Sequence, residues 1–179
     1  MKNKVLSDSK EIWVEEIMSA YGDKMIRVGY SYLKDWGMAQ EVVQEVFITC
    51  YKHYSHYSEA ENIKALIYKI TINRCKDVLR TNFVRKVIVG SELFASRKSP
   101  ELSPEEHFVN RDINAILADG ILSLPVKYRE VILLYYYEDL TIVEIGHMLK
   151  TNQNTIKSRL KRGREMLEEK LEGSFRNES

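Results

Sequence analysis

The sequence predicts an all-α protein made of two small helical domains joined by a flexible linker. Apolar residues recur at steps of three and four along most of the 179 residues, and no segment alternates for long enough to predict a sheet. Serines and prolines replace this periodicity between residues 84 and 110. Because a stretch this long without periodicity is uncommon inside one compact domain, we expect a first domain over residues 1–83, a linker over 84–110 and a second domain over 111–179.

Four helices are predicted in the first domain, each marked by an apolar stripe. The stripes run over residues 12–21, 25–33, 38–54 and 63–80. The third is the clearest, and it includes Tyr51 and Tyr54. Its opposite face holds Glu41, Gln44 and Glu45, a polar face with net negative charge that suits a basic partner helix. An ordinary solvated surface fits the same pattern.

The second domain is predicted to end in two helices separated by a short break. Thr141 and Glu144 have the spacing of a capping box, which opens a short helix that runs to Leu149. A last helix follows over residues 153–171. Two further helices, over 113–124 and 126–138, precede this pair, with Pro125 in the first turn of the second. A short helix, a tight break and a second helix form a helix-turn-helix, which places its second helix in the DNA major groove.

The last helix has the two faces that this arrangement requires. Ile156, Leu160, Gly163 and Leu167 fall on one side, whereas the opposite side carries residues that bond base edges and phosphates. Residues 153–164 include five basic side chains and no acidic one. A solvated basic face is the plainer interpretation of the charge alone, but the preceding capped helix and the short break favour DNA binding. The candidate contacts are Asn154, Thr155, Lys157, Ser158, Arg159, Lys161 and Arg162.

A family resemblance rests on these segments. Leu124-Pro125-Val-Lys-Tyr-Arg-Glu-Val131 and Thr155-Ile-Lys-Ser-Arg-Leu-Lys-Arg-Gly-Arg164 resemble conserved region four of the sigma-70 family, which binds the minus-thirty-five promoter element. Three positions depart from the family pattern. Lys150 and Thr151 stand where the turn usually has glycine and an aliphatic residue, and Gly146 stands where alanine is usual. We expect Lys150 to adopt the turn conformation at some energetic cost.

The first domain resembles region two of the same family. Ala39-Gln-Glu-Val-Val-Gln-Glu-Val-Phe47 is similar to the helix that grips the polymerase clamp, with Gln40 where an acid is usual. The resemblance therefore implies that Glu41, Gln44 and Glu45 bind core RNA polymerase.

The segment from Ile63 to Arg80 resembles the helix that recognises the minus-ten element, with Leu66 in place of the usual tryptophan. The resemblance and the residue types imply minus-ten contacts by Tyr54, Tyr57, Asn73, Arg74, Lys76 and Arg80. For Tyr54, a place in the domain core is an equally good interpretation.

Composition excludes several classes of protein. The formal net charge is +1, so any nucleic-acid footprint must be a local patch. No signal-peptide core or membrane-span candidate is found, and we expect a cytoplasmic protein. Cys50 and Cys75 form no CxxC pair, and Cys50, His53 and His56 cannot all face one metal on a helix. We expect no catalytic residue, metal or cofactor.

Order and length match the minimal layout of the extracytoplasmic-function group of sigma factors. The resemblance implies a factor that binds core polymerase and directs initiation at the promoters of stress or envelope-response genes. It also implies an anti-sigma partner, commonly anchored to the inner face of the membrane, and no small-molecule substrate. Two other interpretations stay open at this point. One is a stand-alone helix-turn-helix regulator, and the other is a helical adaptor that binds only protein.

Overall fold

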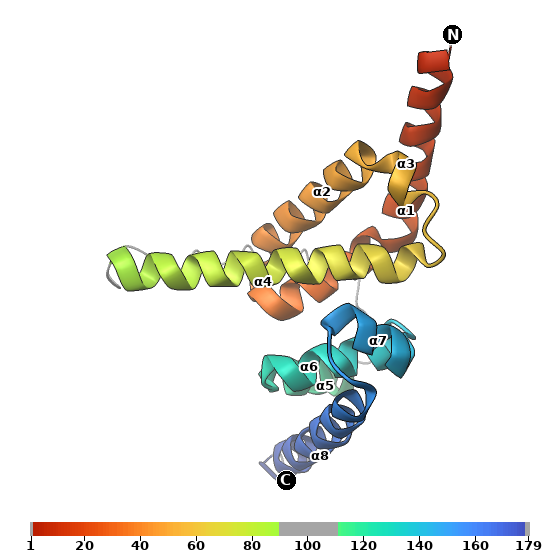
Figure 1. Cartoon of the computed structure of the whole chain (residues 1–179). Coiled ribbons are helices and arrows are strands. Elements are labelled where there is room, and N and C mark those ends of the chain that lie inside the picture. The colour runs from red at the N-terminus through yellow and green to blue at the C-terminus, as the bar shows by residue number, and fades with distance from the viewer. Residues whose placement is uncertain (1, 90–110, 178–179) are drawn as a thin grey trace. The chain divides into compact units, whose positions relative to one another are not determined.

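The computed structural model describes residues 2–89 and 111–177, with side chains described for residues 9–81 and 116–173. Within these ranges the secondary structure is helical and includes no strand, which confirms the predicted all-α class (Figure 1). The chain divides into two compact units, Met1–Pro100 and Glu101–Ser179.

The first unit begins with one long helix, α1 (Lys2–Leu33), where the sequence analysis predicted two. Buried Ile17, Met25 and Val28 lie at helical spacing on both sides of Gly22, so one apolar stripe continues through the expected break. A glycine inside a helix costs only about 1 kcal/mol relative to alanine. Packing of the stripe against α2 and α4 therefore outweighs the local preference for a break.

A tight turn joins α1 to α2 (Trp36–Lys52). Lys34 has a left-handed backbone with φ 58°, and Oδ1 of Asp35 accepts a hydrogen bond from the N–H of Met38 at 2.9 Å. The rings of Tyr30 and Trp36 stack with centroids 4.0 Å apart. The break expected between the stripes over residues 25–33 and 38–54 is confirmed: it comprises Lys34 and Asp35, and Asp35 caps α2.

Helices α2, α3 (Tyr54–Tyr57) and α4 (Ile63–Val89) complete the first unit. The apolar stripe of α2 is buried as predicted, except for Met38, which is half-buried, and Tyr51, which is exposed. Helix α4 continues six residues past the domain boundary predicted at residue 83. The rest of the predicted linker, residues 90–110, lies outside the described residues.

The second unit contains α5 (Arg111–Ser123), α6 (Val126–Ile132), α7 (Ile142–Leu149) and α8 (Gln153–Asn177). The predicted 126–138 helix ends in a π-helical turn, η2 (Leu133–Tyr137), in which the N–H of Glu138 bonds to the carbonyl of Leu133. Buried Arg129 ties the α5–α6 turn together. Its Nη1 donates to the carbonyls of Leu122 at 2.5 Å and Leu124 at 3.1 Å. Helices α5, α6 and α7 all pack against α8, which fixes the last helix at the edge of this core.

Candidate nucleic-acid and polymerase interfaces

Helix α7 opens with the capping box that the sequence predicts. The N–H of Glu144 donates to Oγ1 of Thr141 at 3.2 Å, and the N–H of Thr141 donates to Oε2 of Glu144 at 2.8 Å. Two N–H groups that would otherwise have no partner at the helix start are thereby satisfied. The start of the helix-turn-helix is consequently fixed by local sequence.

The turn between α7 and α8 is closed by a left-handed residue. Lys150 has φ 51° and ψ 45°, as expected, and the N–H of Thr151 donates to the carbonyl of Gly146 at 2.9 Å. A Cβ atom on Gly146 would lie 2.9 Å from the carbonyl oxygen of Thr151, closer than such atoms approach. The turn of this chain therefore requires glycine at position 146, where the family usually has alanine.

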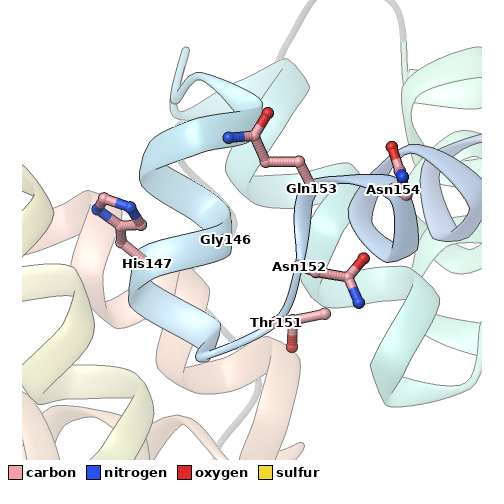
Figure 2. Close-up of a pocket in the computed structure, with 6 residues that line it drawn as sticks. All are labelled: Gly146, His147, Thr151, Asn152, Gln153 and Asn154. Carbon is pink, nitrogen blue, oxygen red and sulfur yellow. The ribbon is translucent and has the colours of Figure 1, made fainter.

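An open pocket lies between the end of α7 and the start of α8 (Figure 2). Its lining comprises Gly146, His147, Thr151, Asn152, Gln153 and Asn154. These side chains offer amide, hydroxyl and imidazole groups but no carboxylate or thiol. Such groups bond phosphates and base edges. The hydroxyl of Thr151 donates to the backbone carbonyl of Leu149 at 3.1 Å.

The first turn of α8 is held by Asn152, a residue that the sequence analysis did not single out. Its Oδ1 accepts a hydrogen bond from the N–H of Thr155 at 2.8 Å. The preference of asparagine for helix N-caps was the available signal. On the inner side, Ile156 and Leu160 are buried, and Gly163 lets α8 approach α6 closely, because a Cβ there would lie 3.1 Å from Cγ1 of Ile132.

The outer face of α8 carries most of the residues predicted to contact the minus-thirty-five element. Exposed on it are Asn154, Lys157, Ser158, Lys161 and Arg162, with Thr155 half-buried. The side chains of Lys161 and Arg162 are 76% and 53% exposed, and both form ion pairs with Glu165, at 4.0 and 3.2 Å. The hydroxyl of Ser158 donates to the carbonyl of Asn154 at 2.9 Å. This face can therefore present three long cations, Lys157, Lys161 and Arg162, and several amide or hydroxyl groups to DNA.

Arg159 differs from the other predicted contacts. Its Nη1 lies 3.3 Å from Oε1 of Glu130 on α6, and the two side chains are 26% and 6% exposed. The ion pair turns Arg159 toward the protein core and away from the outer face of α8. We therefore expect Arg159 to position the recognition helix, and its contact with DNA stays a prediction. The acid on α6 was missed because a single glutamate in a helix gives no signal of its partner.

In the first unit, the polar face predicted on α2 is exposed. Glu41, Gln44 and Glu45 all face solvent, opposite the buried stripe. Ile48 and Tyr51, one and two turns further along, are exposed on the same side. The placement of Tyr51 in the apolar stripe was wrong, because at helical spacing it falls outside the face that α1 and α4 cover. The face is consequently acidic at one end and apolar at the other.

The two tyrosines predicted to hold a promoter base lie on α3. Tyr54 is half-buried, with its ring edge-on to that of half-buried Trp13 at a centroid distance of 5.4 Å, so it packs against α1. Tyr57 is also half-buried, with the rings of His53 and His56 5.6 and 5.7 Å away. Tyr57 thus has the more accessible surroundings of the pair, since both histidines are exposed.

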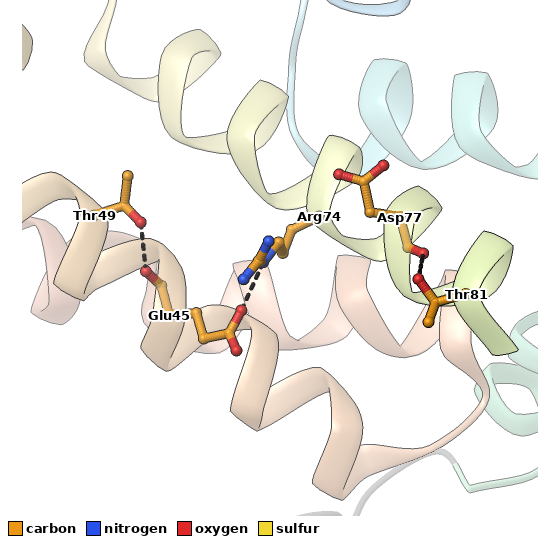
Figure 3. Close-up of polar contacts among 5 residues, drawn as sticks. All are labelled: Glu45, Thr49, Arg74, Asp77 and Thr81. Atoms are coloured by element: carbon orange, nitrogen blue, oxygen red, sulfur yellow. Dashed lines mark hydrogen bonds and ion pairs between the residues drawn. The ribbon is translucent and has the colours of Figure 1, made fainter.

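The minus-ten residues on α4 do not form one uniform face. Asn73, Lys76 and Arg80 are exposed. The ammonium of Lys76 lies 5.7 Å from the ring centroid of Tyr32. The guanidinium of Arg80 forms an ion pair with Asp77 at 3.1 Å. Arg74 turns toward α2 instead, where its Nε donates to Oε2 of Glu45 at 2.6 Å (Figure 3). A residue predicted to bind DNA and one predicted to bind polymerase are thus bonded to each other.

Two other kinds of site find no support in the described part of the chain. Burial raises the pKa of the Cys50 thiol to about 11 and that of Cys75 to about 12, which keeps both protonated and unreactive at neutral pH. Among the described residues, no group of three or more His, Cys, Asp and Glu side chains is placed to hold a metal ion. The same residues contain no helix long and apolar enough to cross a membrane.

Comparison with known proteins accounts for both units. The family model for sigma-70 region 2 matches residues 17–83, and the model for sigma-70 region 4 matches residues 115–167. The chain belongs to the sigma-70 family. Its relatives place it in the extracytoplasmic-function (ECF) group, whose members are transcription initiation factors and not enzymes. The alternative of a stand-alone regulator is not favoured, because region 2 accounts for the first unit.

Two curated relatives from Bacillus subtilis illustrate the similarity. The ECF RNA polymerase sigma factor SigW is 29% identical over 87% of this chain and 87% of its own length. The ECF RNA polymerase sigma factor SigM is 27% identical over 86% of this chain and 92% of its own length.

Two solved structures share the fold of this sigma factor. The sigma factor RpoE from Bartonella quintana, solved in complex with the anti-sigma factor NepR, superposes with a TM-score of 0.72 and 18% identity over 88% of this chain and 96% of the other. CnrH, solved with the cytosolic domain of CnrY, gives a TM-score of 0.63 and 15% identity over 94% and 96%.

Proposed function

We propose that this sigma factor binds core RNA polymerase through α2 and contacts promoter DNA through α3, α4 and α8. The observation that carries the proposal is the opposite character of the exposed faces. Glu41, Gln44 and Glu45 give α2 an acidic face, whereas the outer face of α8 presents Lys161 and Arg162. An acidic face attracts a basic protein helix and repels DNA, while the cationic face does the reverse.

The proposal divides the promoter elements between the two units. Asn154, Thr155, Lys157 and Ser158 would join Lys161 and Arg162 at the minus-thirty-five element. Tyr57 would contact an unstacked base of the minus-ten element, and Asn73, Lys76 and Arg80 would follow the strand. Because a helix rises about 1.5 Å per residue, Asn73 lies about 15 Å along α4 from its first residue. The strand would therefore have to run along α4 from the α3 end.

The test adds the purified chain to core RNA polymerase and maps the transcripts made from fragmented genomic DNA of the source. We expect starts that appear only with the chain and that share two upstream elements. Core binding without specific starts would point to an adaptor that sequesters polymerase. Retention of duplex DNA without core binding would contradict the proposed use of α2.

A charge-matched pair of variants tests the role of α8. Replacing Lys161 by alanine is expected to weaken holoenzyme binding to the mapped promoters and to lower the slope of log affinity against log salt by about 1, since one phosphate contact is lost. Lys170→Ala removes the same charge from an exposed position beyond the recognition turns and serves as the control. Equal effects of the two changes would show that only overall charge matters.

We further propose that an anti-sigma factor holds this chain inactive in the cytoplasm until a signal releases it. RpoE of Bartonella quintana and CnrH were solved in complex with NepR and with the cytosolic domain of CnrY. The exposed apolar residues Ile48 and Tyr51 give α2 a surface on which a protein partner can pack. Co-expression with a candidate inhibitor, which can be membrane-anchored, tests the pairing. A candidate that never co-elutes in gel filtration is not the partner.

A further inference from the structure

We infer that the ion pair between Glu45 and Arg74 couples polymerase binding to DNA binding, so that polymerase releases Arg74 toward the promoter strand. The inference rests on the proposed function, because it takes Glu45 as a polymerase contact. Nε of Arg74 lies 2.6 Å from Oε2 of Glu45, and the side chains are 53% and 52% exposed (Figure 3). Both groups are therefore accessible to a partner while bonded to each other.

The position of Arg74 on α4 explains why the pair withholds it from DNA. At about 100° per residue, Asn73, Lys76 and Arg80 fall within an arc of about 60°. Arg74 lies about 100° from Asn73 and about 160° from Lys76 on the same projection. Its guanidinium consequently rests on the α2 side of the helix, off the face formed by the other three residues.

The carboxylate of Glu45 can pair either with Arg74 or with a cation of polymerase. The backbone carbonyl of Glu45 accepts a hydrogen bond from Oγ1 of Thr49 at 2.8 Å, within the regular helix α2. Its carboxylate is 52% exposed, so a second cation can reach it without movement of α2. A basic helix of polymerase that binds this carboxylate competes with Arg74 for the same negative charge and repels the guanidinium. A nearby DNA phosphate is then the alternative partner for Arg74.

The expected size of the coupling follows from the exposure of the pair. Exposed ion pairs contribute a few tenths to about 1 kcal/mol. Removing Arg74 as the internal competitor should accordingly raise the affinity of the full chain for core polymerase by about twofold to fivefold. The same change should weaken opening of the mapped promoters by the holoenzyme, because one phosphate contact is lost.

The experiment measures the affinity of the full-length chain for core RNA polymerase, followed with a fluorophore on the N-terminal amine of the chain. The unchanged chain is compared with Arg74→Gln, Glu45→Gln and the double variant. We expect Arg74→Gln to bind core more tightly, and we expect it to have no effect in the Glu45→Gln background. Lys69→Gln is the matched control. It removes one positive charge from α4 five residues earlier and about 140° around the helix, about 7 Å along the axis, and should leave core affinity unchanged.

Unchanged or weaker core binding by Arg74→Gln would overturn the inference. So would a gain that Lys69→Gln reproduces or that persists without Glu45. Glu41→Gln separates this failure from failure of the proposed function, since Glu41 lies one turn before Glu45 on the same face of α2. If Glu41→Gln fails to weaken core binding, the polymerase face itself is misassigned. If Glu41→Gln weakens binding while Arg74→Gln does not strengthen it, only the coupling is wrong. Thermal unfolding followed by circular dichroism checks that each variant is folded.

Discussion

Replacing Lys150 by glycine is expected to stabilise the second unit, although it removes no clash and adds no contact. Lys150 has φ 51° and ψ 45° and an exposed side chain. A left-handed conformation costs an L-residue roughly 1–2 kcal/mol, whereas glycine adopts it freely. Glycine also gains entropy in the unfolded chain, which offsets part of the benefit. We therefore expect a net gain of about 1 kcal/mol, or about 4–8 °C in Tm for a domain of 60–100 residues.

Urea unfolding can assign this gain to the correct unit. Both tryptophans, Trp13 and Trp36, lie in the first unit, so their fluorescence reports that unit alone, whereas far-UV circular dichroism reports both. We expect Lys150→Gly to move the circular-dichroism transition of the second unit and to leave the fluorescence transition in place. An unchanged or lower midpoint would refute the strained turn.

The reciprocal change at Gly146 has the opposite expected sign. Helix propensity alone favours Gly146→Ala by about 1 kcal/mol. The Cβ that alanine adds would lie 2.9 Å from the carbonyl oxygen of Thr151, so the turn must shift. We expect net destabilisation, measured by the same urea transition. A gain in stability would mean that the turn relaxes freely and that glycine is not required there.

Further predictions concern the core contacts and the thiols. Glu130→Ala should lower the free energy of unfolding of the second unit by about 2–3 kcal/mol. This is somewhat less than the 3–5 kcal/mol typical of a broken buried pair, because Arg159 is 26% exposed. A loss in urea unfolding of under a third of that free energy would contradict the positioning role. Cys50 and Cys75 should react with a thiol reagent at pH 8 only when the chain unfolds in urea, and fast reaction of the native chain would contradict their burial. Since burial raises both pKa values to about 11 and 12 from 9.0, the thiols favour the native state up to about pH 9, and this contribution should be lost as pH rises toward 12. Replacing both thiols by alanine should reduce the alkaline loss of stability.

Periodicity and capping chemistry were sufficient to predict most of the fold. The apolar stripe of α2 and the Thr141–Glu144 box are local signals, and the structure contains both. The left-handed turn at Lys150 followed from the family resemblance, because the family usually has glycine at that position of the turn. The break expected near Gly22 did not, since long-range packing of α1 decides that point and a local pattern does not contain it.

Contacts between residues far apart in the chain could not be predicted from the sequence. Arg159 and Glu130, like Arg74 and Glu45, are 29 residues apart. In each case the basic residue is of the type, and at the helix position, expected of a DNA contact. Only the packing of two helices shows that it is paired with an acid of the same chain. Spacing along one helix predicts i,i+3 and i,i+4 pairs, but it does not show which cations are paired with an acid on another helix.

These internal pairs bear on how the sigma factor uses DNA. Arg80 is paired with Asp77, and Lys161 and Arg162 share Glu165, so most of the long cations proposed to meet DNA already have an acidic neighbour. Each must exchange that neighbour for a phosphate when DNA binds, which subtracts a few tenths to about 1 kcal/mol from every contact. With a formal net charge of only +1, the free chain has little long-range attraction to compensate. We therefore expect weak binding of duplex DNA by the free chain and strong binding only when polymerase holds both units over the promoter. A stand-alone regulator would require the reverse, and tight, salt-dependent binding of duplex DNA by the free chain would show that the internal pairs do not limit it.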